Sequence, residues 1–394
     1  MTPRRSDQAR GTESDGLRAL PDPADPRAQQ HSPEANEPVV AVLGGGPAGM
    51  SCALWLLRLG LAPVLIEPSE VLGGAQLLSP FENGWFLGTD GLTGYQLAER
   101  FSRHIEAASI PFVLGCPVAG IAKADHGFRI VAGPEFTVRC IVVATGQRVK
   151  GFQAVESIPG SRHLHDSPRV CFNPGATPGL VSRVSGSVVA VVGGGDNAMV
   201  TALHLGREAQ HTHLFVRSGV RAFGVYRAAV LDLVAAGRIT LHERAAIEAF
   251  DSSGSRISIT FHDRGGQHQE LLFDQLCFRL GFIPNAEEPV RLLERGGVGS
   301  LRLTDGGHIV TDQFLRTSLP SVYAVGDVAN PRDPCVATAV AHGAIAARSI
   351  EEDLNKRDAS DAGRDEEFRT VAHDEFLSLP PESAATRATT RQQS

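Results

Sequence analysis

Residues 39–67 read as an apolar strand, a glycine-rich turn, a helix and a second apolar strand. Gly44, Gly46 and Gly49 form the pattern G-x-G-x-x-G directly after the first strand. In such a turn the first glycine permits the bend, the second lets a pyrophosphate approach, and the third lets the helix pack on the strand. The helix N-terminus attracts the phosphates, and Glu67 ends the second strand where a carboxylate can bind both ribose hydroxyls. The stretch therefore predicts a dinucleotide site in an α/β fold.

The same plan returns later in the chain, which indicates an internal duplication. A strand at 188–192 leads into Gly193, Gly195 and Ala198, the tolerated G-x-G-x-x-A variant, and then into a helix and a strand. The second strand closes on Arg217, with Arg221 shortly after it, and no acid. Arginines can pair with a 2′-phosphate that a carboxylate would repel. We therefore expect FAD at the first turn and NADPH at the second, with two solvated surface arginines as the alternative.

The bulk composition narrows the class of protein. The chain has 394 residues, enough for two or three domains, and a net charge of −7, which argues against nucleic acid as a partner. No apolar run reaches the roughly 18 residues of a membrane helix, and the start has no apolar signal region. The six cysteines include no C-x-x-C. We expect a cytoplasmic protein with no membrane partner and no metal site.

Several motifs in order resemble the thioredoxin-reductase-like (class II) pyridine nucleotide-disulfide oxidoreductases. They are GGGPAG at 44–49, LGGAQL at 72–77, LTGYQLAERF at 92–101, ATG at 144–146, GGGDNA at 193–198, GFIPN at 281–285 and VYAVGD at 322–327. The resemblance implies an α/β fold of two Rossmann-like dinucleotide-binding domains with three-layer ββα character. It places the NAD(P)H domain, residues 151–280, inside a discontinuous FAD domain of residues 38–150 and 281–353. Tails at 1–37 and 354–394 are expected to be disordered, and the resemblance implies a homodimer.

The resemblance also assigns site residues. For FAD these are Gly44, Gly46, Pro47, Ala48, Gly49, Glu67, Gln76, Asn83, Thr145, Gly146, Gly326, Asp327 and Val336. For NADPH they are Gly193, Gly195, Asp196, Asn197, Ala198, Arg217 and Arg221. Asp327 matches an acid that binds the ribityl chain, and the helix beginning near Val336 would direct backbone N–H groups at the flavin.

Two departures from the family pattern bear on function. Where thioredoxin-reducing members carry C-x-x-C, this chain reads Cys171-Phe172-Asn173-Pro174. Thiol–disulfide exchange needs an attacking and a resolving thiol, so we expect that Cys171 has no local resolving partner and is a buried, inert thiol; it is the one candidate catalytic residue. Val216 replaces an arginine of the family's 2′-phosphate motif, so a preference for NADPH over NADH is expected to be relaxed.

These features favour an FAD-dependent NAD(P)H oxidoreductase that passes electrons to an unidentified acceptor, a ferredoxin- or flavodoxin-type carrier or a small molecule, and not through an internal dithiol. One alternative is a flavin monooxygenase or small-molecule oxidase, for which His163 and His165 of the linker loosely resemble a known histidine motif. Another is a flavin-binding sensor or partner subunit without turnover. Arg279 favours this slightly, because a buried arginine in an apolar strand requires a paired acid.

Overall fold

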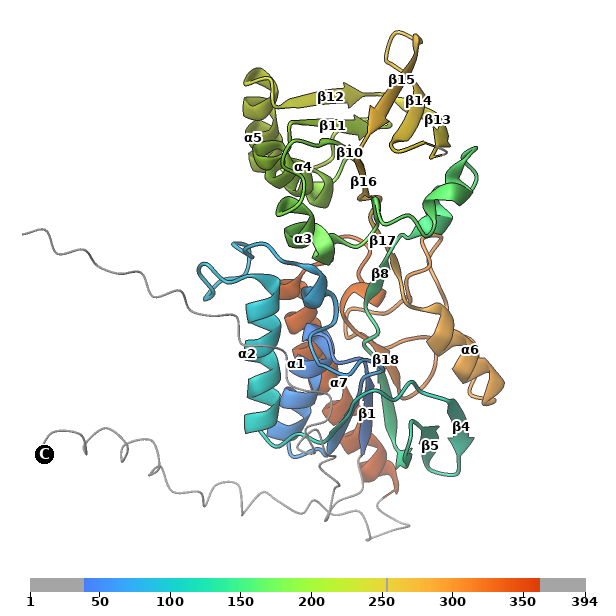
Figure 1. The fold of residues 1–394 in the computed structure, drawn as a ribbon. Helices are drawn as coiled ribbons and strands as arrows, with labels where there is room; N and C mark the ends of the chain where they lie inside the picture. Colours follow the sequence, from blue (N-terminus) through green and yellow to red (C-terminus); the bar gives the residue numbers. More distant parts are fainter. Residues whose placement is uncertain (1–38, 253, 362–394) are drawn as a thin grey trace, which may run out of the picture.

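The computed structural model describes residues 39–361 apart from residue 253, and Figure 1 shows them as two lobes joined by a narrow connection. The first lobe is built on a five-stranded parallel sheet with the order β18-β7-β1-β2-β3. Its strands are β1 (Val40–Leu43), β2 (Pro63–Ile66), β3 (Phe112–Val113), β7 (Cys140–Val143) and β18 (Val322–Ala324). Its helices are α1 (Pro47–Arg58), α2 (Gly94–Ala107), α6 (Glu287–Arg295) and α7 (Val336–Asp361).

The first lobe has three layers because successive residues of β1 face opposite sides of the sheet. Val40 and Val42 belong to a core cluster with α1 and α7 residues such as Leu56 and Ile350. Ala41 and Leu43 belong to a second cluster with a small antiparallel sheet, β4 (Gly120–Ala124), β5 (Gly127–Val131) and β6 (Glu135–Val138). The predicted ββα layering is confirmed.

The second lobe repeats this plan. Its parallel sheet has the order β12-β11-β10-β16-β9. The strands are β9 (Val170–Cys171), β10 (Val188–Val192), β11 (His211–Val216), β12 (Ile239–Glu243) and β16 (Gln275–Phe278). The helices are α3 (Thr177–Val181), α4 (Asp196–Glu208) and α5 (Gly224–Ala235), and the added antiparallel layer is β13 (Ala246–Asp251), β14 (Ile257–His262) and β15 (His268–Phe273).

Two antiparallel strands connect the lobes. They are β8 (Gln147–Val149), which leaves the first lobe, and β17 (Phe282–Pro284), which returns to it (Figure 1). Short 3₁₀ turns occur at η1 (Gly74–Leu78), η2 (Phe152–Ala154), η3 (Ser161–Leu164), η4 (Pro174–Ala176) and η5 (Gly326–Val328). The second lobe is thus inserted between two segments of the first.

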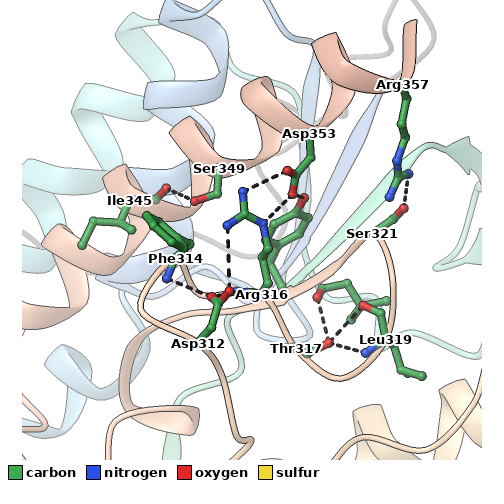
Figure 2. Close-up of polar contacts among 12 residues, drawn as sticks. Asp312, Phe314, Arg316, Thr317, Leu319, Ser321, Ile345, Ser349, Asp353 and Arg357 are labelled. Atoms are coloured by element: carbon green, nitrogen blue, oxygen red, sulfur yellow. Dashed lines mark hydrogen bonds and ion pairs between the residues drawn. The ribbon is translucent and has the colours of Figure 1, made fainter. Parts of the chain in front are cut away.

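The C-terminal helix α7 is longer than the sequence predicted. The tail expected from residue 354 is helical through Asp361, and Leu354 is buried in the first core cluster, so the prediction of disorder is wrong for residues 354–361. Figure 2 shows the polar contacts that hold this helix: Arg316 donates two hydrogen bonds, of 2.7 and 2.9 Å, to the carboxylate of Asp353. Residues 1–37 and 362–394 lie outside the described residues.

Within residues 39–361, no helix has both the length and the apolarity that crossing a membrane requires.

Candidate active site

The first glycine turn shows why each glycine is needed. Gly44 has φ +119°, and a side-chain carbon there would lie 2.3 Å from the Ala144 carbonyl oxygen at the end of β7. A carbon on Gly49 would lie 1.9 Å from the Gly44 oxygen, so α1 packs directly on the turn. The space around Gly46 is open, because a side-chain carbon there would have Gly74 Cα, at 3.8 Å, as its nearest neighbour. The open space at the second glycine is the cradle that a pyrophosphate requires.

Glu67 is held at the end of β2 by backbone groups. It is buried, its Oε2 accepts the Gly45 N–H at 2.6 Å, and its Oε1 accepts the Ser69 N–H at 2.9 Å. A carboxylate has about four lone-pair sites, so acceptor capacity remains for ribose hydroxyls. The sequence analysis did not identify Gly45 or Ser69, because both residues bind Glu67 through backbone N–H groups.

Six buried side-chain polar atoms lack hydrogen-bond partners among the described residues, and two of them lie in elements beside the first glycine turn. These two are Asp327 Oδ1 in η5 and Gln76 Oε1 in η1. Burial raises the pKa of Asp327 to about 6, opposed by a hydrogen bond from Gln147. Buried polar atoms are normally satisfied, so these orphans fit a ligand with hydroxyl and amide groups, such as the ribityl and ring portions of FAD.

The elements around Asp327 converge on the first turn of α1. A side-chain carbon on Gly326 would lie 2.7 Å from Ala48 Cβ, and one on Gly343 of α7 would lie 2.5 Å from the Ala48 oxygen. The Gly326 N–H donates to His342 Nδ1 at 3.3 Å. The structure therefore brings Gly326, Asp327 and α7, which begins at Val336, next to the first glycine turn, with Pro47 as the first residue of α1.

Thr145, Gly146 and Asn83 have structural partners of their own. Thr145 Oγ1 donates to the Asn285 carbonyl at 2.7 Å, and Asn285 Nδ2 donates back to the Thr145 carbonyl at 3.0 Å. The Gly146 carbonyl accepts the Asn285 N–H at 2.9 Å. Asn285, in the motif GFIPN, was not among the predicted site residues. Asn83 lies in the loop before α2, where its Oδ1 accepts the Trp85 N–H at 3.4 Å, so it is engaged within its own loop.

The second glycine turn repeats the first. Gly193 has φ +149°, and a side-chain carbon there would lie 2.2 Å from the Arg279 carbonyl oxygen, while nothing lies within 4 Å of a carbon placed on Gly195. Asp196 Oδ1 accepts the Phe223 N–H at 2.8 Å, and the Arg221 N–H donates to the Gly194 carbonyl at 2.7 Å. These bonds fold the loop 217–223 against the turn and leave the Arg217 and Arg221 side chains exposed beside it. Asn197 and Ala198 follow in the first turn of α4.

Cys171 departs from its prediction. It stands at the end of β9, and its register partner in β16 is Cys277. The structure places a second thiol beside Cys171, because parallel pairing brings together two residues far apart in the sequence. The pKa of Cys171 falls to about 6, through the hydrogen bond with Cys277 and the nearby Arg279 charge, against the effect of burial.

Arg279 is buried at 4% exposure without the paired acid that the sequence analysis required. Its donors reach Thr201 Oγ1 and Thr177 Oγ1, each at 3.0 Å, and the Cys171 and Phe278 carbonyls, at 3.1 and 2.8 Å. Its remaining contact is Nη2 to Cys171 Sγ at 3.7 Å. Among the described residues, no carboxylate contacts this guanidinium.

Contacts between the lobes come from the loop between η1 and α2 and from α2 itself. Trp85 Nε1 donates to the Tyr226 hydroxyl at 3.1 Å, and the Trp85 ring lies 5.0 Å from that of Phe223. Tyr95 of α2 donates to the Gly175 carbonyl of η4 at 3.1 Å. Both contacts join the first lobe to the region around the second turn.

His163 and His165 have contacts of their own in the second lobe. The His165 ring pairs with Asp166 at 2.8 Å on the exposed linker, and His163 offers its backbone carbonyl to Ser252.

The model of the family described as "Pyridine nucleotide-disulphide oxidoreductase" matches residues 38–343. The chain belongs to this family. The oxidoreductase is 29% identical over 322 residues to a thioredoxin reductase of Coxiella burnetii, covering 80% of this chain and 95% of that protein. It is 27% identical over 330 residues to the thioredoxin reductase of Vibrio cholerae, covering 80% of this chain and 96% of that protein.

The fold agrees with these relatives. The crystal structure of Lactococcus lactis thioredoxin reductase superposes with a TM-score of 0.70 at 24% identity, covering 81% of this chain and 100% of that one. The protein is therefore a thioredoxin-reductase-like flavoprotein oxidoreductase whose cofactors are FAD and NADPH. The open cradles at Gly46 and Gly195 and the unpaired Asp327 and Gln76 atoms fit these two groups.

Proposed function

We propose that this oxidoreductase reduces bound FAD with NADPH and passes the electrons from the flavin directly to an acceptor, without a C-x-x-C dithiol. The supporting observation is the loop after β9. Pro174 stands where the family's second cysteine would be, and it is buried where η4 contacts η1. Cys171 is directed instead to Arg279 and Cys277 within the second lobe. The acceptor is then a ferredoxin- or flavodoxin-type carrier or a small molecule.

We assign FAD to the first lobe. When bound, this cofactor accepts a hydride and releases electrons, and the protein's task is to bind and orient it. Gly44, Gly46 and Gly49 with the N-terminus of α1 would hold the pyrophosphate, and Glu67 the ribose. Asp327 and Gln76 would supply the acceptors for the ribityl hydroxyls and the ring. The N-terminal N–H groups of α7 would place partial positive charge beside the ring.

We assign NADPH to the second lobe. The turn from Gly193 to Gly195 and the N-terminus of α4 would hold its pyrophosphate. Arg217 and Arg221 would bind the 2′-phosphate, because they flank the turn and the Arg221 N–H is tied to Gly194. A homodimer and a cytoplasmic location remain predictions from the resemblance and the composition.

An anaerobic titration of the FAD-loaded protein with NADPH tests this function. We expect stoichiometric bleaching of the flavin absorbance. A flavin that stays oxidised despite bound FAD and excess NADPH would exclude a reductase and favour a binding role. Steady-state assays with ferredoxin, flavodoxin and quinone acceptors then separate a carrier from a small molecule.

The phosphate assignment is tested by Arg217→Ala and Arg221→Ala. A hydrogen bond to a charged group contributes about 1.5–3 kcal/mol, so each change should lower kcat/KM for NADPH by about 10- to 100-fold. The same parameter for NADH should hold nearly constant, because NADH has no 2′-phosphate. Arg183→Ala, an exposed arginine of the same lobe outside this loop, is the matched control. Equal losses of kcat/KM for NADPH and NADH would show that the arginines do not bind the 2′-phosphate.

A further inference from the structure

Two thiols lie side by side in the second lobe. Cys171 of β9 and Cys277 of β16 are register partners on neighbouring parallel strands. Neighbouring strands lie about 4.7–4.9 Å apart, within the Cα separation of about 4.4–6.8 Å that a disulfide spans. Both cysteines are free thiols in this structure. The backbone therefore already brings them close enough to be joined.

The two thiols differ in access. Cys277 is fully buried, whereas Cys171 is partly exposed at the end of its strand, before the loop that leads to Pro174. When protonated, Cys171 donates to the Asn173 carbonyl at 3.1 Å. A reagent from solvent therefore reaches Cys171 before Cys277.

Arg279 makes the thiolate form of Cys171 favourable. Its guanidinium is buried, and its four oxygen partners are all neutral: two threonine hydroxyls and two backbone carbonyls. A buried cation without an anion is costly. Among its hydrogen-bond partners in the described part of the chain, the Cys171 sulfur is the one group that can carry a negative charge.

The pKa values of the two thiols shift in opposite directions. The Cys277 hydrogen bond and the Arg279 charge lower the pKa of Cys171 to about 6, although burial opposes them. The pKa of Cys277 shifts in the opposite direction, because this thiol keeps the shared proton and is fully buried. At neutral pH the pair therefore holds an accessible thiolate beside a protonated thiol.

We propose that Cys171 and Cys277 form a hydroperoxide-reactive dithiol site. The Cys171 thiolate attacks an oxygen of the peroxide, the O–O bond breaks, and the alcohol or water leaves with a solvent proton. Cys171 is then a sulfenic acid. The Cys277 sulfur attacks Cys171 Sγ, and its proton leaves with the hydroxyl as water. Two thiols are oxidised to one disulfide while the peroxide is reduced.

The oxidant is assigned by size. Cys171 is only partly exposed and contacts the Asn173 carbonyl and Arg279, which favours a small oxidant over a bulky disulfide. The reaction takes no electrons from FAD or NADPH, so it is independent of the reductase function. Regeneration requires an external thiol.

Peptide mapping after oxidation tests the site. The full-length FAD-loaded protein, without NADPH, is treated at pH 7 with one equivalent of hydrogen peroxide, alkylated and digested without reductant. We expect one cross-link, between Cys171 and Cys277. In Cys277→Ser the cross-link should be absent, and a sulfenic-acid probe such as dimedone should label Cys171. Cys335→Ser, which removes an exposed thiol elsewhere, is the control and should retain the cross-link.

The pH profile gives a second readout on folded protein. Alkylation of Cys171 by iodoacetamide in the Cys335→Ser protein should be half-maximal near pH 6, the pKa of that thiol. Three results would each overturn the proposal. They are a Cys171 profile centred near pH 9, the ordinary pKa of a cysteine thiol, oxidation of another cysteine before Cys171, or oxidised Cys171 in the wild-type protein with Cys277 still reduced.

Discussion

Asp327 illustrates how a single buried carboxyl depends on its ligand. Its Oδ1 has no partner among the described residues, and burial raises its pKa from 3.8 to about 6. Because the folded pKa is raised, the stabilisation of the apoprotein by this group is complete below pH 3.8 and is lost as the pH rises through about 6. A ligand whose hydroxyls donate hydrogen bonds to Asp327 would instead favour the ionised carboxylate.

We therefore predict that FAD affinity rises with pH up to about pH 6. Hydrogen bonds from ribityl hydroxyls favour the ionised carboxyl and lower its pKa in the complex. The change should be about fivefold between pH 5 and pH 6, since the ionised fraction of a carboxyl with a pKa of about 6 rises from about one tenth to one half over that interval. Fluorescence titration of apoprotein with FAD measures it. Asp327→Asn should flatten the profile, whereas Asp305→Asn on the exposed surface should not. An unchanged profile in Asp327→Asn would remove Asp327 from the site.

At the scale of elements, α7 is stabilised by contacts that come from outside the helix. Arg316 binds the Asp353 carboxylate through two nitrogens, and the Tyr323 hydroxyl donates to the same group at 2.7 Å (Figure 2 shows the arginine). These bonds lower the pKa of Asp353, and burial together with the bond to Asp353 raises the pKa of Tyr323. We call the contacts of Arg316 and Tyr323 with Asp353 the α7 clamp. Since α7 packs along α1 and begins beside η5, the clamp also stabilises the candidate flavin site.

Asp353→Asn should destabilise the first lobe by about 1–2 kcal/mol, after allowance for partial solvent screening of the pair. Because the Asp353 pKa is lowered, its contribution is present above pH 3.8 and is lost as the pH falls below that value. Thermal unfolding of the FAD-loaded protein at pH 7 measures the effect. Glu351→Gln, which breaks the more exposed Arg348 pair on the same helix, should cost less than about 0.5 kcal/mol. Equal shifts for both variants would contradict the clamp.

At the scale of the whole molecule, two kinds of contact relate the lobes. The strands β8 and β17 form the covalent connection, and the Trp85 loop reaches across to α5. Trp85 contacts Phe223, which comes two residues after Arg221 in the candidate phosphate loop. A nucleotide bound there would therefore alter the surroundings of an aromatic side chain from the other lobe.

We predict that NADP⁺ changes the emission of Trp85. The chain has two tryptophans, so Trp55→Phe leaves Trp85 as the sole reporter and Trp85→Phe leaves Trp55. The oxidised nucleotide is used to keep the flavin oxidised. The emission change should persist in Trp55→Phe and be lost in Trp85→Phe. A response that survives in Trp85→Phe would show that the interlobe contact does not sense the nucleotide.

Local spacing was enough to predict both glycine turns, because each turn requires glycine for its own backbone conformation or for packing of its own helix. Gly44 and Gly193 need positive φ, and Gly49 lies against its own turn. These constraints act over a few residues and can be read directly. The ββα layering followed from the resemblance and from the apolar strands that the sequence placed around each turn. The partnerships of Asn285 with Thr145 and of Trp85 with Tyr226 could not be read this way, because each joins distant segments.

The sequence by itself determined the two dinucleotide units, their order and the missing C-x-x-C, since each depends on residue types at short spacing. Only the tertiary structure decided which groups surround Cys171 and which groups bind Arg279. Parallel pairing of β9 with β16 sets Cys277 beside Cys171, and burial of Arg279 against neutral oxygens makes the Cys171 sulfur its one ionisable contact among the described residues. Burial and strand register are properties of the assembled lobe, so the charge state of that thiol is decided there.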